Sequence, residues 1–338
     1  MNSPATGQTT SSLTSSHSFK QHSGVISLVM AVLIFSTMPA LLKYLSKHLD
    51  LWTLVSLRQI ISACFWLPFL LRFLSQKRLE ANQLPRFLIL GAIYALGHIL
   101  WNAAVFTNQV SVLIFVGRMI FLWSTIFGFI FIVSERVLMR KPLFWSAFGC
   151  CLLGLGMMYI AVRRGEAEGI VGGGGHPYGI PIMLACTLCW GAYGVALKRL
   201  FPRIHPAVGF SALNWVTIPV FIALLFSLGD PSKLTQLSAE LWIVLILFSI
   251  TSSGLGHFFA FLSIQKIGPV ITEGVFNVIP FITTAIAAAT LGERMNPLQW
   301  GAGLTIFTGS CLLFILLLQR KRERAAALPS GTPPHTDS

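Results

Sequence analysis

The fold of this chain is decided by residues 255–294, LGHFFAFLSIQKIGPVITEGVFNVIPFITTAIAAATLGER. Two apolar runs meet there at the short connection KIGP, residues 266–269, and the second run ends at Gly-Glu-Arg. The second run carries Glu273, Asn277 and Pro280, which share one face of a helix. Glu273 is the one acid of the chain that lies inside an apolar run, so this face is expected to meet protein or water rather than lipid.

A second copy of this stretch lies upstream at residues 96–136, LGHILWNAAVFTNQVSVLIFVGRMIFLWSTIFGFIFIVSER. It begins with the same Leu-Gly-His and ends with the same Glu-Arg, and the copies match over their length with a single one-residue shift. The correspondence continues beyond the copies, where Trp145 matches Trp300 at an offset of 155. Because the identities occur in order across five successive apolar segments, we predict that the chain consists of two homologous halves.

The composition is that of a polytopic membrane protein. Hydrophobic residues make up 54% of the 338 and charged residues 10%, whereas globular proteins have roughly 25% charged residues. A spanning helix needs about 20 apolar residues, and the long uniform runs do not resemble the short alternating strands of a membrane barrel. We therefore predict an all-α membrane protein with ten transmembrane helices. The candidates lie near 24–45, 51–73, 86–107, 111–133, 143–162, 178–199, 206–228, 241–265, 269–291 and 298–318.

The distribution of basic residues predicts the topology. The net charge of +13 could indicate a nucleic-acid partner, but the charges gather on one side of the expected membrane. With both termini in the cytosol, sixteen Lys and Arg are cytosolic and six lie on the opposite side, as the positive-inside rule requires. Five spans per half then give the two repeats inverted topology. We expect a multi-pass protein of the cell inner (plasma) membrane.

The segments outside the spans have simple expected roles. Residues 1–22 are rich in Ser and Thr and are predicted to form a disordered cytosolic tail. The first five-helix repeat is expected over 23–163 and the second over 178–319, joined by a Gly-rich extracytosolic linker at 164–177. Residues 320–338 form a basic and then Pro-rich cytosolic tail.

Neither a disulfide framework nor an enzyme is predicted. All six cysteines fall inside expected spans, and Cys186 and Cys189 are interpreted as packing residues rather than a metal pair. No His-Glu-x-x-His or Gly-x-Ser-x-Gly motif is present, and Glu273 has no second intramembrane acid beside it. We therefore expect no catalytic residue, no metal and no cofactor.

Polar and charged residues within the spans are the candidate site. A charge at membrane depth costs roughly 2.5–3.5 kcal/mol on insertion scales, so such residues usually face a cavity. Arg118 is predicted to bind an anionic group of a solute, with a tether between helices as the alternative. His98 and His257 match in the two copies, as proton carriers or as packing residues. Arg58 is a weaker candidate because it lies near the outer start of its span.

Depth along the helices predicts two polar layers. At 1.5 Å per residue, Arg118 lies roughly 6 Å outside the midplane and Glu273 roughly 10 Å inside it, so no direct salt bridge between them is expected. An outer layer then holds His98 and Arg118, and an inner layer holds His257 and Glu273. We predict that Glu273 and His257 gate or proton-couple the cytosolic side, unless Glu273 is only an interfacial charge.

Aromatic, amide and proline residues complete the predicted site. Apolar walls are expected from Trp101, Trp190, Tyr193 and Phe261. Asn102 and Asn277 are expected to supply orienting hydrogen bonds. Helix breaks are expected at Pro39 and Pro280. The fifth span, with Gly149, Gly154 and Gly156, is expected to pack closely against another helix.

Three stretches give the chain a resemblance to a known family. They are SERVLMRKPLFWSAFGCCLLGLG and LGERMNPLQWGAGLTIFTGSCLL at the ends of the two copies, with NVIPFITTAIAAATLGER before the second. The chain resembles the drug/metabolite transporter superfamily, specifically EamA-type permeases, over nearly all of residues 24–318. The resemblance implies ten helices in two inverted five-helix repeats and a central cavity lined mainly by spans 1, 3, 4, 6, 8 and 9. The first half departs from the pattern, because Leu122 stands where the second half has Pro280.

Together these features predict a secondary active transporter, an exporter or exchanger of a small organic metabolite such as an amino acid or a related compound. It would work by alternating access, and the sequence has no nucleotide-binding loop. A lipid flippase of the same fold, or a non-transporting membrane scaffold, is the alternative. The expected partners are the small-molecule solute and the lipid bilayer, with no nucleic acid, and a homodimer is left open.

Overall fold

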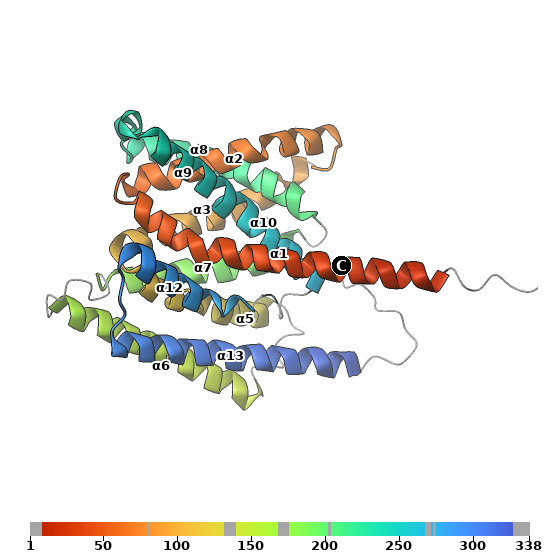
Figure 1. The fold of residues 1–338 in the computed structure, drawn as a ribbon. Helices are drawn as coiled ribbons and strands as arrows, with labels where there is room; N and C mark the ends of the chain where they lie inside the picture. The colour runs from red at the N-terminus through yellow and green to blue at the C-terminus, as the bar shows by residue number, and fades with distance from the viewer. Residues whose placement is uncertain are drawn as a thin grey trace, which may run out of the picture.

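The structure is a computed structural model that describes residues 9–79, 81–131, 140–167, 176–201, 204–267, 272 and 275–326. The described part of the chain is helical and contains no strand. Figure 1 shows the long helices packed side by side in one bundle. The α-helices are α1 (Thr9–Leu45), α2 (Leu51–Ser75), α3 (Leu84–Thr107), α4 (Val110–Val116), α5 (Met119–Phe131), α6 (Pro142–Ala167), α7 (Gly179–Leu200), α8 (Pro206–Ser227), α9 (Ala239–Ser249), α10 (His257–Ile267), α12 (Ile279–Leu291) and α13 (Pro297–Ala326), and the short helical turns are η1 (Ala81–Gln83), η3 (Pro231–Gln236) and η4 (Ile250–Gly256).

This architecture is that of a multi-pass integral membrane protein. Within the described residues, nine helical segments are long and apolar enough to cross a membrane, and Ile279–Leu291 is a shorter apolar helix. Large apolar side chains lie on the outer surface, where Phe226 is 73% and Leu153 61% exposed, as expected for side chains that meet lipid. The predicted all-α membrane fold is confirmed, while the division into two inverted repeats stays a prediction.

Two predicted tails are partly helical. Helix α1 begins at Thr9, inside the segment predicted to be disordered, because residues 9–22 contain no Pro or Gly that would stop a helix. Helix α13 runs on to Ala326, where Lys141 Nζ lies 2.6 Å from Glu323 Oε1 and fastens its end to α6. At the predicted linker, α6 continues to Ala167, and residues 168–175 lie outside the described part of the chain.

Three of the spans are interrupted in mid-course. The fourth span divides into α4 and α5 at Gly117 and Arg118, and α12 begins after a turn at Asn277 and Val278. In the eighth span, α9 and α10 are joined by the π-helical turn η4. Backbone groups at such breaks need partners from the protein itself, because lipid offers none. Interrupted spans of this kind are often found at functional sites.

The two predicted helix breaks have different outcomes. Pro280 lies in the first turn of α12, where its missing N–H is not needed. The prediction for Pro39 is wrong, because α1 continues through it without interruption. The hydroxyl of Thr283 on α12 donates to the carbonyl of Ser36 at 3.0 Å, so a neighbouring helix supplies a donor beside the proline.

Helices α6 and α13 form the closest helix pair, and they lie side by side along one edge of the bundle in Figure 1. Small residues make this possible. A Cβ added at Gly154 would lie 2.7 Å from Ile306 Cγ1 and 2.8 Å from Ile306 N. The prediction for Gly149 and Gly156 is wrong, since a Cβ at either would meet open space. Those two are seven residues apart and share a face of α6 turned away from α13.

Gly154→Ala is therefore expected to lower the stability of the protein by about 1–3 kcal/mol, since the added methyl meets backbone that cannot move aside cheaply. The measurement is thermal unfolding of the detergent-purified protein. Gly149→Ala and Gly156→Ala are matched controls on the same helix and should leave the unfolding temperature unchanged or slightly raised. Equal losses in all three variants would contradict the assigned contact.

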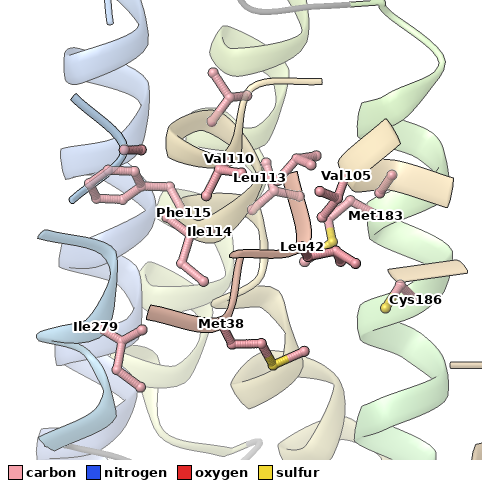
Figure 2. Close-up of a cluster of buried hydrophobic side chains, with 14 of the residues drawn as sticks. Met38, Leu42, Val105, Val110, Leu113, Ile114, Phe115, Met183, Cys186 and Ile279 are labelled. Carbon is pink, nitrogen blue, oxygen red and sulfur yellow. The ribbon is translucent and has the colours of Figure 1, made fainter. Parts of the chain in front are cut away.

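An apolar core joins elements that are far apart in sequence (Figure 2). It contains Met38 and Leu42 of α1, Ile114 of α4, Cys186 of α7 and Ile279 of α12, all buried. Cys186 therefore packs as a small apolar residue, and the described cysteines are all free thiols. This core fixes α1, α4, α7 and α12 relative to one another, and the polar residues described below lie on the same helices and their neighbours.

Candidate functional site

Four aromatic side chains from three helices meet inside the bundle. The ring centroid of His98 on α3 lies 4.4 Å from that of Tyr94, 5.0 Å from Trp190 on α7 and 5.8 Å from His257 at the start of α10. Trp190 stacks on His257 at 5.2 Å with an interplanar angle of 18°. We call these four residues the His98 cluster. Both halves of the sequence contribute to it.

Local sequence explains how α3 builds its part of this cluster. Tyr94, His98 and Asn102 are spaced by four residues, so they lie on one face of the helix, and all three are buried. Gly97 allows the indole to approach, since a Cβ there would lie 3.1 Å from Trp190 Cε2. Asn102 Nδ2 donates to the carbonyl of His98 at 2.7 Å. The polar face of α3 therefore points into the bundle.

Both ring nitrogens of His98 lack a protein partner. Within the described residues, neither makes a hydrogen bond, although the side chain is buried. Trp101 Nε1 and Asn277 Nδ2 also lack a hydrogen bond there, but no contact places them in the cluster. A buried polar group without a partner costs about 1–3 kcal/mol. Such atoms are suited to hydrogen bonds with a bound solute, and they need an explanation other than stability.

Arg58 on α2 is a charged residue beside this cluster, deeper in the protein than its place near the start of the span suggested. It is fully buried, and Nη1 donates to Asn102 Oδ1 at 3.0 Å. Nη2 donates to the hydroxyls of Ser252 and Ser253 in η4, at 3.1 and 3.3 Å. The depth of Arg58 could have been estimated from the sequence, because Asp50 is a typical helix-capping residue and does cap α2. Counted from that cap, Arg58 lies about 12 Å along the helix axis.

Asp50 itself is held by its capping contacts. Thr53 N donates to Asp50 Oδ1 at 2.9 Å, and Lys233 Nζ lies 3.7 Å from Oδ2. Desolvation opposes ionisation of this carboxyl, but the Thr53 hydrogen bonds and the Lys233 charge outweigh it and lower the pKa of Asp50. The cap therefore favours the folded state above the ordinary carboxyl pKa, and its contribution is lost as the pH falls through the lowered value.

A further set of polar contacts continues along α2 toward α8. Tyr94 donates its hydroxyl to Gln59 Oε1 at 3.3 Å, and the hydroxyl of Ser62 donates to Asn214 Oδ1 at 3.1 Å. Trp215 Nε1 donates to the carbonyl of Ala63 at 2.9 Å. These bonds tie α2 to α3 and α8, so the helix that carries Arg58 is fixed on both sides.

Arg118 lies at the break between α4 and α5 and reaches the other interrupted span. Its Nη1 donates to the carbonyl of Phe276 at 2.9 Å, immediately before the turn at Asn277. Arg118 therefore links the two mid-span breaks to each other. Its predicted contact with a solute anion stays a prediction.

The prediction of two separate histidine layers is wrong. His98 and His257 lie in one cluster, with ring centroids 5.8 Å apart. Depth counted along straight helices at 1.5 Å per residue does not allow for helix tilt or for breaks within spans. The π-helical turn η4 directly before His257 also departs from regular helical geometry. Glu273, the other residue of the predicted inner layer, lies outside the described residues.

The remaining predicted wall residues have different positions. Tyr193 is buried, with its ring centroid 5.5 Å from Trp190 and 5.9 Å from Tyr94. Phe261 lies 6.2 Å from Phe210 and lines a small apolar hollow together with Tyr193. Trp101 is partly buried and packs against the apolar core instead.

The repeated Glu-Arg sequence has a structural role that was not predicted. The carboxylate of Glu293, after α12, accepts from Val110 N at 2.9 Å, Ser111 N at 2.9 Å and the hydroxyl of Ser111 at 2.8 Å. Lys43 Nζ donates to the carbonyls of Val105 and Asn108 at the end of α3. An anion thus faces the start of α4 and a cation the end of α3, which suits both helix dipoles. The first copy, Glu135 and Arg136, lies outside the described residues.

Nothing in the described residues gathers metal ligands, because no three His, Cys, Asp or Glu side chains come together there in a suitable group. The arrangement is instead a buried cluster of aromatic rings, imidazoles and one guanidinium between transmembrane helices. Such a site offers an apolar body and a few hydrogen bonds to a small molecule.

Comparisons with known proteins bear on the fold and on the family. A solved structure, described only as the crystal structure of a protein, aligns with 90% of this chain and 99% of its own, with a TM-score of 0.58 and 17% identity. At that identity the likeness concerns the fold alone. No curated protein gives a significant match. Residues 177–315 match the EamA-like transporter family.

Proposed function

We propose, from the EamA-like transporter domain that residues 177–315 of this chain contain, that the protein is a secondary active transporter of a small organic solute. The observation that carries the proposal is the His98 cluster. Residues of α3, α7 and α10 meet there, and they come from both halves of the sequence. Both imidazole nitrogens of His98 lack protein partners among the described residues. A solute bound between two halves is accessible to either side when the halves move relative to each other.

The interrupted spans support alternating access as the mechanism. The breaks at Gly117–Arg118 and at Asn277–Val278 let each of these spans change direction in mid-membrane. Arg118 joins the two breaks through the Phe276 carbonyl, so a shift of one span is transmitted to the other. We retain the proposals that Arg118 also meets an anionic group of the solute and that His257 and Glu273 act in gating or proton coupling.

The cellular setting follows from the charge distribution. We propose the cytoplasmic membrane with both termini in the cytosol, because that orientation satisfies the positive-inside rule. Export or exchange of a metabolite is part of the proposal, with amino acids and related compounds as the first class to test.

The experiment is solute flux into vesicles that contain only the purified full-length protein. We expect a solute gradient, a proton gradient or exchange across the membrane to drive uptake without ATP. Protein-free vesicles are the control, and a fluorescent phospholipid in the same vesicles tests for lipid movement. Strict ATP dependence, or lipid scrambling without solute flux across a broad metabolite panel, would contradict the proposal.

A further inference from the structure

Arg58 carries a positive charge that the described part of the protein leaves without a carboxylate. All of its hydrogen bonds go to neutral oxygens, those of Asn102, Ser252 and Ser253. The guanidinium carbon lies 4.4 Å from the ring centroid of Phe248, and Nε has no hydrogen-bond partner among the described residues. The side chain is fully buried. A buried charge satisfied only by neutral groups is costly, so stability alone does not explain this arginine.

The present partners of Arg58 are weaker than a carboxylate would be. A guanidinium stays charged at any working pH. Its bonds to the hydroxyls of Ser252 and Ser253 are 3.1 and 3.3 Å long, whereas N–H to carboxylate bonds are about 2.7–2.9 Å long and roughly twice as strong as neutral ones. The hydroxyls can rotate away, and η4, which carries both, is a π-helical turn of the kind common at functional sites. An incoming carboxylate can therefore replace them.

Arg58 also lies at the edge of the proposed solute site. Asn102 accepts from Arg58 and donates to the carbonyl of His98. The charge of Arg58 is close enough to act electrostatically on Tyr94, His98 and His257. A carboxylate bound to the guanidinium would place the remainder of the solute against these rings.

We propose that Arg58 binds the carboxylate of a monoanionic solute whose apolar or aromatic body packs in the His98 cluster. This inference rests on the proposed transport function and narrows its substrate class. One guanidinium balances one negative charge, whereas a dianionic phosphate would leave one negative charge unbalanced. An ammonium group would add a second positive charge beside Arg58. The aromatic rings suit an apolar body.

The test uses ligands that share one body and differ in charge. The purified full-length protein is titrated with 3-phenylpropionate, its uncharged amide, phenylalanine and phenyl phosphate, and ligand stabilisation is measured by thermal shift. Butyrate and indole-3-acetate, each with its amide, extend the series to a smaller and a larger body. We expect the carboxylates with a fitting body to bind about tenfold or more tightly than their amides, phenylalanine or phenyl phosphate.

Two substitutions separate binding by Arg58 from a purely structural tether. Arg58→Gln is expected to abolish carboxylate stabilisation, while Arg72→Gln, at an exposed position near the end of the same helix, should leave it unchanged. Asn102→Asp keeps Arg58 and places a carboxylate where Asn102 Oδ1 now accepts from it. That variant loses the donor to the His98 carbonyl but gains an ion pair with Arg58, so it should still fold. It should lose about tenfold or more in carboxylate affinity, because its own Asp occupies the guanidinium.

The outcomes are distinct. If Arg58→Gln fails to fold, Asn102→Asp decides, and undiminished carboxylate binding in that variant overturns the inference. Loss of carboxylate binding in Arg118→Gln but not in Arg58→Gln assigns the anion to Arg118 and overturns it as well. If a neutral or zwitterionic solute is transported and none of the carboxylates binds, this inference is wrong and the proposed function stands. If no solute of any charge is moved, the proposed function itself fails.

Discussion

Replacing His98 by phenylalanine is expected to raise the thermal stability of the protein without solute while weakening solute binding. His98 is buried, and within the described residues its two ring nitrogens make no hydrogen bond. Phenylalanine keeps a planar ring against Tyr94 and Trp190 and removes the unsatisfied polar atoms. The expected gain is about 1–3 kcal/mol, the cost of a buried polar group without a partner.

The same substitution should weaken binding of a transported solute by about tenfold or more, equivalent to about 1.4 kcal/mol or more. The measurements are the melting temperature without solute and the solute-dependent thermal shift. His48→Phe makes the same chemical change at an exposed position and should alter neither. A lower melting temperature together with retained solute binding would show that the His98 imidazole is a packing residue. That result would remove His98 from the site.

Sequence periodicity and hydropathy were sufficient for much of the fold. The spans follow from runs of about 20 apolar residues. The buried face of α3 follows from the four-residue spacing of Tyr94, His98 and Asn102. Both signals are local, because hydropathy and helical spacing depend only on neighbours in the chain. The start of α12 at Ile279, next to Pro280, was foreseeable for the same reason, since proline restricts the backbone where it stands.

The contacts that define the site are not local, and the sequence did not contain them in any readable form. Arg58 receives its partners from positions 44 and 194 residues away. The distance between His98 and His257 depends on how η4 turns the chain, and the Ser-Ser-Gly run in that turn indicates an irregularity without fixing its geometry. The donor beside Pro39 comes from Thr283 of another helix. A single sequence shows which residues are unusual for a membrane, but the packing of distant helices decides what they touch.

The Glu-Arg dipeptide that ends each copy is an example of a sequence pattern whose contacts could not be predicted. The repetition was visible in the sequence, but the role of Glu293 required its partners at Val110 and Ser111, which are 183 and 182 residues away. Glu293 is only 9% exposed and accepts three hydrogen bonds at the start of the seven-residue helix α4. It therefore connects the end of α12 to the first half of an interrupted span.

Glu293→Gln is expected to destabilise the protein by about 1.5–3 kcal/mol, the value of a hydrogen bond to a charged group. The amide keeps the shape of the side chain but has one accepting oxygen, so it cannot satisfy both Val110 N and Ser111 N from separate oxygens as the carboxylate does. It also removes the negative charge that faces the helix dipole of α4 and acts on Lys43. The measurement is thermal unfolding of the purified protein.

Hydrogen–deuterium exchange tests whether the loss of stability in Glu293→Gln is located around α4. The amides of Val110 and Ser111 donate to Glu293, so exchange in residues 108–116 should accelerate in Glu293→Gln while the rest of the bundle changes less. Glu240→Gln is the matched control, because Glu240 also lies in the first turn of a helix, α9, but is exposed. That variant should lose no more than about 0.3–1 kcal/mol. If exchange around α4 is unchanged while stability falls, Glu293 acts elsewhere and the connection between α12 and α4 is not what stabilises this face of the protein.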